Sequence, residues 1–191
     1  MTLSRRNIGV AIEIPQPYGG ELQDWRKRLG DPSAANIPPH VTLLPPTGVP
    51  TERLAEVEEH LQYVASHERH FEIHLRGTGT FRPVSPVTFV ALAAGISDCE
   101  RLERHVRSGP LGRRLTFNYH PHVTVAQDVP EDALEEGYRA LAQYEARFPV
   151  WGITLFEEGP DKVWRPQRDF PFGGELPGPP VGHPEPADED V

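Results

Sequence analysis

Two short stretches of the sequence place a histidine two residues before a threonine: His40 and Thr42 in PPHVTLLPP, and His122 and Thr124 in HPHVTVAQ. Histidine exchanges protons near neutral pH, and a threonine hydroxyl can donate a hydrogen bond to a phosphate oxygen. Displacement at a phosphodiester needs a base for the attacking oxygen, an acid for the leaving oxygen and donors for the non-bridging oxygens. Two such motifs supply all of these groups, and no metal is required.

The valine between the histidine and the threonine makes each motif more specific. A chain of this composition would contain His-Val-Thr twice by chance in fewer than about one case in a thousand, so we interpret both copies as functional. Residues i and i+2 of a strand face the same side. Each motif, placed on a strand, would therefore present an imidazole beside a hydroxyl, while its valine packs into the core.

The elements around the motifs repeat in the same order. Apolar periodicity, caps and breakers predict the strands and helices of both units. In the first unit they are strand 7–14, helix 20–30, strand 40–46 stopped by Pro45 and Pro46, helix 50–66 and strand 71–81. In the second they are strand 87–95, helix 97–109, strand 122–127, helix 131–148 and strand 148–159, to which 162–172 could add an edge strand. Each motif begins the second strand of its unit. We therefore predict an α+β fold of duplicated β-α-β-α-β units, related by a pseudo-twofold axis, with the motifs facing each other across a central cleft.

Composition is that of a soluble, cytoplasmic protein. The 191 residues are 37% hydrophobic and 25% charged, and the mean hydropathy is −0.49. No apolar run approaches the roughly 18 residues that a membrane helix needs, so we expect no membrane partner. Cys99 is the only cysteine, which excludes an intrachain disulfide and fits a reducing compartment. We expect Cys99 to be structural, because its surroundings contain nothing that would activate a nucleophile.

The net charge of −9 is unevenly distributed. Residues 174–191 are rich in Pro, Gly and acidic residues and lack Lys and Arg, which predicts a disordered tail outside the fold. The remaining chain is only mildly acidic. This balance disfavours a duplex DNA surface, which needs many phosphate contacts, but permits a small anionic substrate in a locally basic cleft. Arg113 and Arg114, just before the second motif, could turn a guanidinium toward such a cleft or remain solvated at the surface.

With these motifs and this repeat, the sequence resembles the 2H phosphoesterases, and among them the bacterial 2′,5′-RNA ligase-like proteins. The resemblance covers about Asn7 to Phe172. It implies a bilobal domain over residues 1–173, with lobes of about 1–81 and 82–173 between which strands can be exchanged. It also implies a monomer that acts without a cofactor on 2′,3′-cyclic phosphate ends of RNA or nucleotides, or on 2′,5′ linkages. His40 and His122 would share the base and acid roles, and Thr42 and Thr124 would bind phosphate oxygens.

Two other functions are compatible with the motifs. His120 and His122 have the spacing of a two-histidine metal clamp, with His40 as a third ligand, which would make a metal-dependent hydrolase. A non-catalytic RNA or nucleotide binding module could also retain this fold. The other histidines we assign to surfaces, helices or the tail, with His74 the best candidate among them to line the cleft. We assign the tryptophans to the core, although one at the rim of the cleft could stack a nucleobase: Trp25, Trp151 and Trp164.

Overall fold

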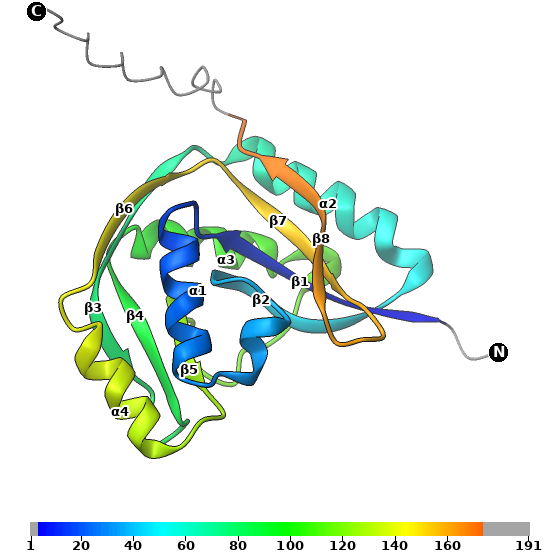
Figure 1. Ribbon diagram of the computed structural model, residues 1–191. Coiled ribbons are helices and arrows are strands. Elements are labelled where there is room, and N and C mark those ends of the chain that lie inside the picture. Colours follow the sequence, from blue (N-terminus) through cyan, green and yellow to red (C-terminus); the bar gives the residue numbers. More distant parts are fainter. Residues whose placement is uncertain (1–3, 174–191) are drawn as a thin grey trace, which may run out of the picture.

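Two four-stranded antiparallel sheets form the framework of the protein (Figure 1). The computed structural model describes residues 4–173, so the tail predicted over 174–191 lies outside the described residues. The elements follow in this order: β1 (Arg5–Glu13), α1 (Tyr18–Arg28), η1 (Pro32–Ala35), β2 (His40–Pro50), η2 (Thr51–Arg53), α2 (Leu54–His67), β3 (Phe71–Thr80), β4 (Val87–Ala94), α3 (Ile96–Val106), η3 (Gly109–Leu111), β5 (His122–Gln127), α4 (Glu131–Ala140), β6 (Glu145–Val150), β7 (Gly152–Glu158) and β8 (Trp164–Pro171). The η elements are short 3₁₀ helices.

The strand order shows that the two halves of the chain exchange strands. One sheet has the order β2-β1-β7-β8 and the other has the order β5-β4-β3-β6. Strand β3, from the first half, therefore pairs in the sheet of the second motif, while β7 and β8 pair in the sheet of the first. The two sheets have equivalent strand orders. β2, which carries the first motif, corresponds to β5, which carries the second, and the next two strands, β1 and β7, correspond to β4 and β3. The predicted α+β fold with two related halves is confirmed.

The two motif strands meet where the sheets join. β2 contacts β5, although the two strands do not pair in one sheet. Each motif strand is also contacted by the first helix of the opposite half, α1 against β5 and α3 against β2. Val41 and Val123, the central residues of the motifs, are fully buried in one hydrophobic core that spans both sheets. Because each valine points into the core, the histidine and threonine on either side of it point the other way, toward the cleft.

Two element boundaries differ from the sequence-based expectation. β2 does not stop at Pro45 and Pro46 but continues to Pro50. β2 is an edge strand, and its pairing with β1 shifts register between Ile8 and Val10, opposite these prolines, so no ladder hydrogen bond is required of them.

The second difference concerns the segment predicted as one helix over 131–148. α4 ends at Ala140, and Glu145–Val150 forms β6, whose residues alternate between exposed and buried. This alternation outweighs the helical periodicity because Ala146, Phe148 and Val150 are buried when β6 pairs with β3. The strand predicted over 148–159 is therefore two strands, β6 and β7, in different sheets.

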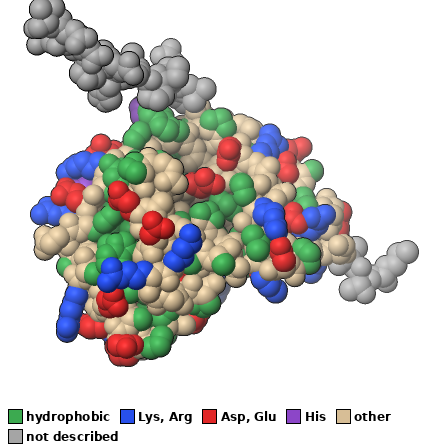
Figure 2. Space-filling view, in the orientation of Figure 1, with side chains coloured by type: hydrophobic (Ala, Val, Ile, Leu, Met, Phe, Trp, Pro, Cys, Tyr) green, Lys and Arg blue, Asp and Glu red, His purple; other side chains and the backbone are tan. Residues whose placement is uncertain are grey.

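The surface is mixed in charge. Figure 2 shows acidic and basic side chains interspersed on one face, without a continuous basic field. Within residues 4–173, no helix has the length and apolar character needed to cross a membrane.

Candidate active site

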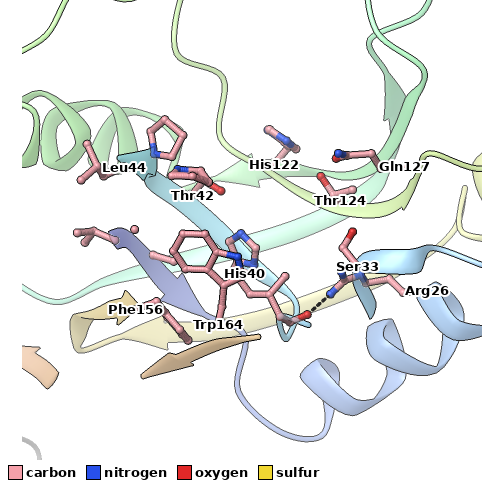
Figure 3. A pocket seen from close by; sticks show the side chains of 16 residues that line it. Arg26, Ser33, His40, Thr42, Leu44, His122, Thr124, Gln127, Phe156 and Trp164 are labelled. Atoms are coloured by element: carbon pink, nitrogen blue, oxygen red, sulfur yellow. Dashed lines mark hydrogen bonds between the residues drawn. The ribbon is translucent and has the colours of Figure 1, made fainter. Parts of the chain in front are cut away.

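All four motif side chains line one cavity of about 360 Å³ (Figure 3). His40 and Thr42 reach it from β2, and His122 and Thr124 reach it from β5. Each of these residues is partly exposed, whereas the valine between them is buried. The structure therefore brings together every site residue that the sequence predicted.

The first motif is aligned by its pairing with β1. Thr42 lies opposite Ala11, and His40 lies opposite Glu13. Directly opposite residues of an antiparallel pair share a face, so the small side chain of Ala11 leaves space in front of Thr42.

The second motif is aligned by β4 in the same way. Thr124 lies opposite Phe89, and His122 lies opposite Ala91. The Phe89 ring supports His122, with ring centroids 5.2 Å apart, and Phe81 meets the same imidazole edge-on at 4.9 Å. Gly79 makes room for this arrangement, since a Cβ there would stand 2.5 Å from the Phe89 ring.

The two imidazoles are held by the same type of hydrogen bond. His40 Nδ1 lies 2.8 Å from the carbonyl oxygen of Pro38, and His122 Nδ1 lies 2.7 Å from the carbonyl oxygen of His120. A carbonyl oxygen only accepts, so each Nδ1 is the N–H donor. In the neutral ring, Nε2 then holds the free lone pair. Either histidine can therefore accept a proton at Nε2 when neutral or donate one from Nε2 when charged.

The charges around the two histidines differ. Burial lowers the pKa of His40 to about 4, and the positive charges of Arg26 and His122 contribute to this lowering. Burial also lowers the pKa of His122, with a contribution from His120 but not from Arg26. Arg26 therefore favours the neutral form of His40 in particular.

Arg26 is a functional candidate that the sequence did not reveal. It is the one Lys or Arg among the described residues that line the cavity, and it is 3% exposed. Its Nε donates to Asp31 at 3.2 Å, and its Nη1 donates to the carbonyl oxygen of Ile37 at 2.6 Å. These contacts fix the guanidinium in the wall of the cavity, where it is paired with the buried carboxylate of Asp31.

Arg26 could not be selected from the pattern of α1, because its neighbours Lys27 and Arg28 are also basic and both are exposed. Arg113 and Arg114, which the sequence offered instead, do not line the cavity. Both are exposed, and Arg113 Nη1 donates to Thr47 Oγ1 at 3.1 Å.

Trp164 forms part of the cavity wall and Trp151 is exposed, so the assignment of these two tryptophans to the core was wrong. Its backbone N–H donates to the carbonyl oxygen of Asn36 at 2.8 Å. Its ring lies against Gly9, where a Cβ would stand 3.4 Å from Cζ3. Ser33 and Gln127 add a hydroxyl and an amide to the lining.

The remaining candidates from the sequence lie elsewhere. His74 is buried and its Nε2 is 2.7 Å from Glu145, away from the cavity. Cys99 is buried, and burial raises the pKa of its thiol to about 12, which does not suit a nucleophile. The His120 ring lies 6.1 Å from that of His122, but His120 does not line the cavity. Within the part of the chain that the structure describes, no group of three or more His, Cys, Asp or Glu side chains is placed to hold a metal ion.

Comparison with known proteins gives consistent results. The family model described as the 2′-5′ RNA ligase superfamily matches residues 14–162. The protein named Putative phosphoesterase BH1439 from Halalkalibacterium halodurans is 27% identical over 171 residues, covering 88% of this chain and 99% of its own length. Putative phosphoesterase OB1230 from Oceanobacillus iheyensis is 29% identical over 167 residues, which cover 86% of this chain and 97% of that protein.

Solved structures show the same fold. The crystal structure of E. coli LigT complexed with 3′-AMP matches with a TM-score of 0.64 at 20% identity, covering 88% of this chain and 99% of that one. The crystal structure of TT0787 from Thermus thermophilus matches with a TM-score of 0.59 at 22% identity, and the match covers 89% of this chain and 100% of that one.

Proposed function

This chain belongs to the 2′-5′ RNA ligase superfamily, and from that premise we propose that it is a metal-independent phosphodiesterase that acts by two-histidine acid and base catalysis. Its substrates are 2′,3′-cyclic phosphate ends of RNA or nucleotides, 2′,5′-phosphodiester linkages, or both. The observation that carries the proposal is the convergence of His40, Thr42, His122 and Thr124 on one cavity beside the buried Arg26.

The cavity offers a separate group for each requirement of the reaction. Neutral His40 accepts a proton from water at Nε2 as the water oxygen bonds to phosphorus. Protonated His122 donates a proton from Nε2 to the ribose oxygen as its bond to phosphorus breaks. The product is a phosphomonoester with a free neighbouring hydroxyl, and the proton lost by water balances the proton gained by the ribose oxygen. If the 5′-hydroxyl of a second end took the place of water as the nucleophile, the same two proton transfers would join the ends: His40 would accept the hydroxyl proton, and His122 would protonate the departing ribose oxygen of the cyclic phosphate.

The assignment of His40 as the base rests on its charge environment. Arg26 disfavours a second positive charge at His40, whereas it does not contribute to the pKa of His122. Arg26 and the two threonine hydroxyls then face the phosphate, whose charge they stabilise. Nucleotide binding by relatives of this fold supports the choice of substrate, because E. coli LigT has been crystallised with 3′-AMP, with NADP⁺ and with ATP.

A turnover assay tests the proposal. Purified protein is incubated with 2′,3′-cyclic nucleotides and with 2′,5′- and 3′,5′-linked dinucleotides, with and without EDTA, and the phosphate position in each product is identified by ³¹P NMR. We expect a phosphomonoester from the cyclic or the 2′,5′-linked substrates and equal rates in EDTA. Turnover that EDTA abolishes and zinc restores would favour the metal clamp of His120 and His122. Tight nucleotide binding without turnover would favour the binding module.

A further inference from the structure

A second cavity adjoins the catalytic one. It has a volume of about 410 Å³, and Ile37 and Trp164 line both cavities. A substrate bound at the histidines could therefore extend past Trp164 into it. This inference rests on the proposed function: we propose that the second cavity binds the nucleobase of the residue upstream of the one that carries the reacting phosphate, so that the preferred substrate is an RNA end of two or more residues and not a mononucleotide.

The side chains around the second cavity favour an uncharged ligand group over an anionic one. No Lys or Arg is among the described residues that line it, and the carboxylate of Glu13 lies at its edge. Burial and the negative charge of Asp169, which lines a neighbouring cavity, raise the pKa of Glu13. A second phosphate would be repelled there, whereas an uncharged base would not.

Its shape and chemistry fit a nucleobase. The apolar side chains that line the second cavity are those of Ile14, Ala34, Ala35, Ile37, Pro38, Pro39, Val163 and Trp164. The backbone N–H of Trp164 donates to the carbonyl oxygen of Asn36, and the Trp164 ring lies against Gly9. A fixed aromatic ring next to apolar side chains is the usual stacking surface for an unpaired base.

One amide in this cavity is available to recognise the base. Gln23 donates to the carbonyl oxygen of Ala34 and accepts from Arg26, and Gln16 accepts from the N–H of Gly20. Asn36 lines the same cavity, and its side-chain amide makes no hydrogen bond with any of residues 4–173. An asparagine amide offers both a donor and an acceptor, which can pair with the edge of a base.

The test compares three substrates that end in a 2′,3′-cyclic phosphate: a mononucleotide, a dinucleotide, and the same dinucleotide with an abasic upstream residue. We expect kcat/KM for the dinucleotide to exceed that for the mononucleotide by about tenfold or more, the effect expected of one stacked base. The abasic dinucleotide should behave like the mononucleotide. Equal kcat/KM for the mononucleotide and the dinucleotide would overturn the second-cavity proposal and leave the proposed function intact.

The variant Asn36→Ala should reduce the preference for the dinucleotide while leaving kcat/KM for the mononucleotide unchanged, because Asn36 does not line the catalytic cavity. Gln62→Ala, at an exposed position of α2, is the matched control and should retain the full preference. A preference for the dinucleotide that Asn36→Ala leaves unchanged would contradict the role of this amide.

Binding provides a readout that does not depend on turnover. Calorimetry with a nucleoside 3′-monophosphate and with a dinucleotide that ends in a 3′-phosphate should show at least about tenfold tighter binding of the dinucleotide. This difference should shrink in Asn36→Ala. If no substrate is turned over, the proposed function fails, yet the second cavity is still tested, because equal affinity for the two ligands would overturn it.

Discussion

The hydroxyl of Tyr119 donates a 2.8 Å hydrogen bond to the backbone carbonyl oxygen of Thr42. Tyr119 precedes β5, so this bond connects the segment that leads into the second motif with the strand that holds the first. Burial raises the pKa of Tyr119, which keeps its hydroxyl protonated and able to donate. One side chain thus sets the position of one motif relative to the other.

Replacing Tyr119 by Phe tests this positioning role. The variant keeps the ring but loses the hydrogen bond, so the free energy of unfolding should fall by about 1 kcal/mol. We expect kcat to fall while the pH profile stays unchanged, because no titrating group of the cavity is altered. Tyr144→Phe is the control, since its hydroxyl donates to Glu21 away from the motifs. If the two variants had the same kcat, Tyr119 would be only a structural residue.

Arg26 should be required for binding of the anionic substrate. Arg26→Gln alone leaves the buried Asp31 without its ion pair, so the double variant Arg26→Gln/Asp31→Asn is the better test of function. With folding verified by circular dichroism, we expect kcat/KM to fall about tenfold or more, the usual effect of a lost charge-assisted hydrogen bond. Arg114→Ala, at an exposed position outside the cavity, should change kcat/KM little. A larger loss of kcat/KM in Arg114→Ala than in the double variant would indicate that the loop arginines, and not Arg26, bind the anion.

The pH dependence of kcat/KM should be bell-shaped, because the reaction needs one neutral and one charged histidine. Activity should rise with pH as His40 loses its proton near pH 4 and fall as His122 loses its proton below pH 6.5, the ordinary histidine value that burial lowers. Removing the positive charge of Arg26 raises the pKa of His40, so the acid limb of the Arg26→Gln/Asp31→Asn profile should move to higher pH. An acid limb that does not move would contradict the effect of Arg26 on His40.

The threonine hydroxyls should act on phosphate oxygens rather than on the fold. Thr42→Val and Thr124→Val preserve the shape and strand preference of the side chain but remove the donor. Each should lower kcat/KM by about tenfold to a hundredfold, as expected for a hydrogen bond to a charged group. Thr78→Val is the control, because its hydroxyl donates to the carbonyl oxygen of Tyr138 outside the cavity. Near-normal kcat/KM in both Thr42→Val and Thr124→Val would show that the two hydroxyls do not bind the phosphate oxygens.

The sequence predicted which face of its strand each motif residue would occupy, because that placement follows from strand geometry. His40 and Thr42 share a face, as do His122 and Thr124, in any strand whose intervening valine is buried. The duplicated order of strands and helices likewise predicted that the two motifs would occupy corresponding places. The alternation of these side chains predicts the structure because burying the valines in the core stabilises that orientation of the strand.

Arg26 and Trp164 could not be predicted because their roles arise from contacts distant in sequence. Trp164 reaches the cavity only because β8 pairs with β7 in the sheet of the first motif, which no local pattern indicates. Arg26 is buried by contacts with Asp31 and Ile37, which follow the helix, and basic residues are usually exposed. The pairing of β8 with β7 and the burial of one particular charge are tertiary features that no local sequence pattern indicates.

The central claim is that His40 and His122 act together as base and acid on one phosphate. The direct measurement is kcat/KM for a 2′,3′-cyclic nucleotide, as a function of pH, in the wild type, His40→Ala, His122→Ala and the control His67→Ala, an exposed histidine outside the cavity. Each motif variant should lose about 10²- to 10⁴-fold, and His67→Ala should match the wild type. The residual activity of His122→Ala should rise with pH as the remaining base, His40, loses its proton, and this rise should lie above pH 4 because the charge of His122 no longer lowers the pKa of His40. Near-normal activity in either folded motif variant would contradict the account, and residual activity of His122→Ala that falls over that pH range would reverse the assignment of base and acid.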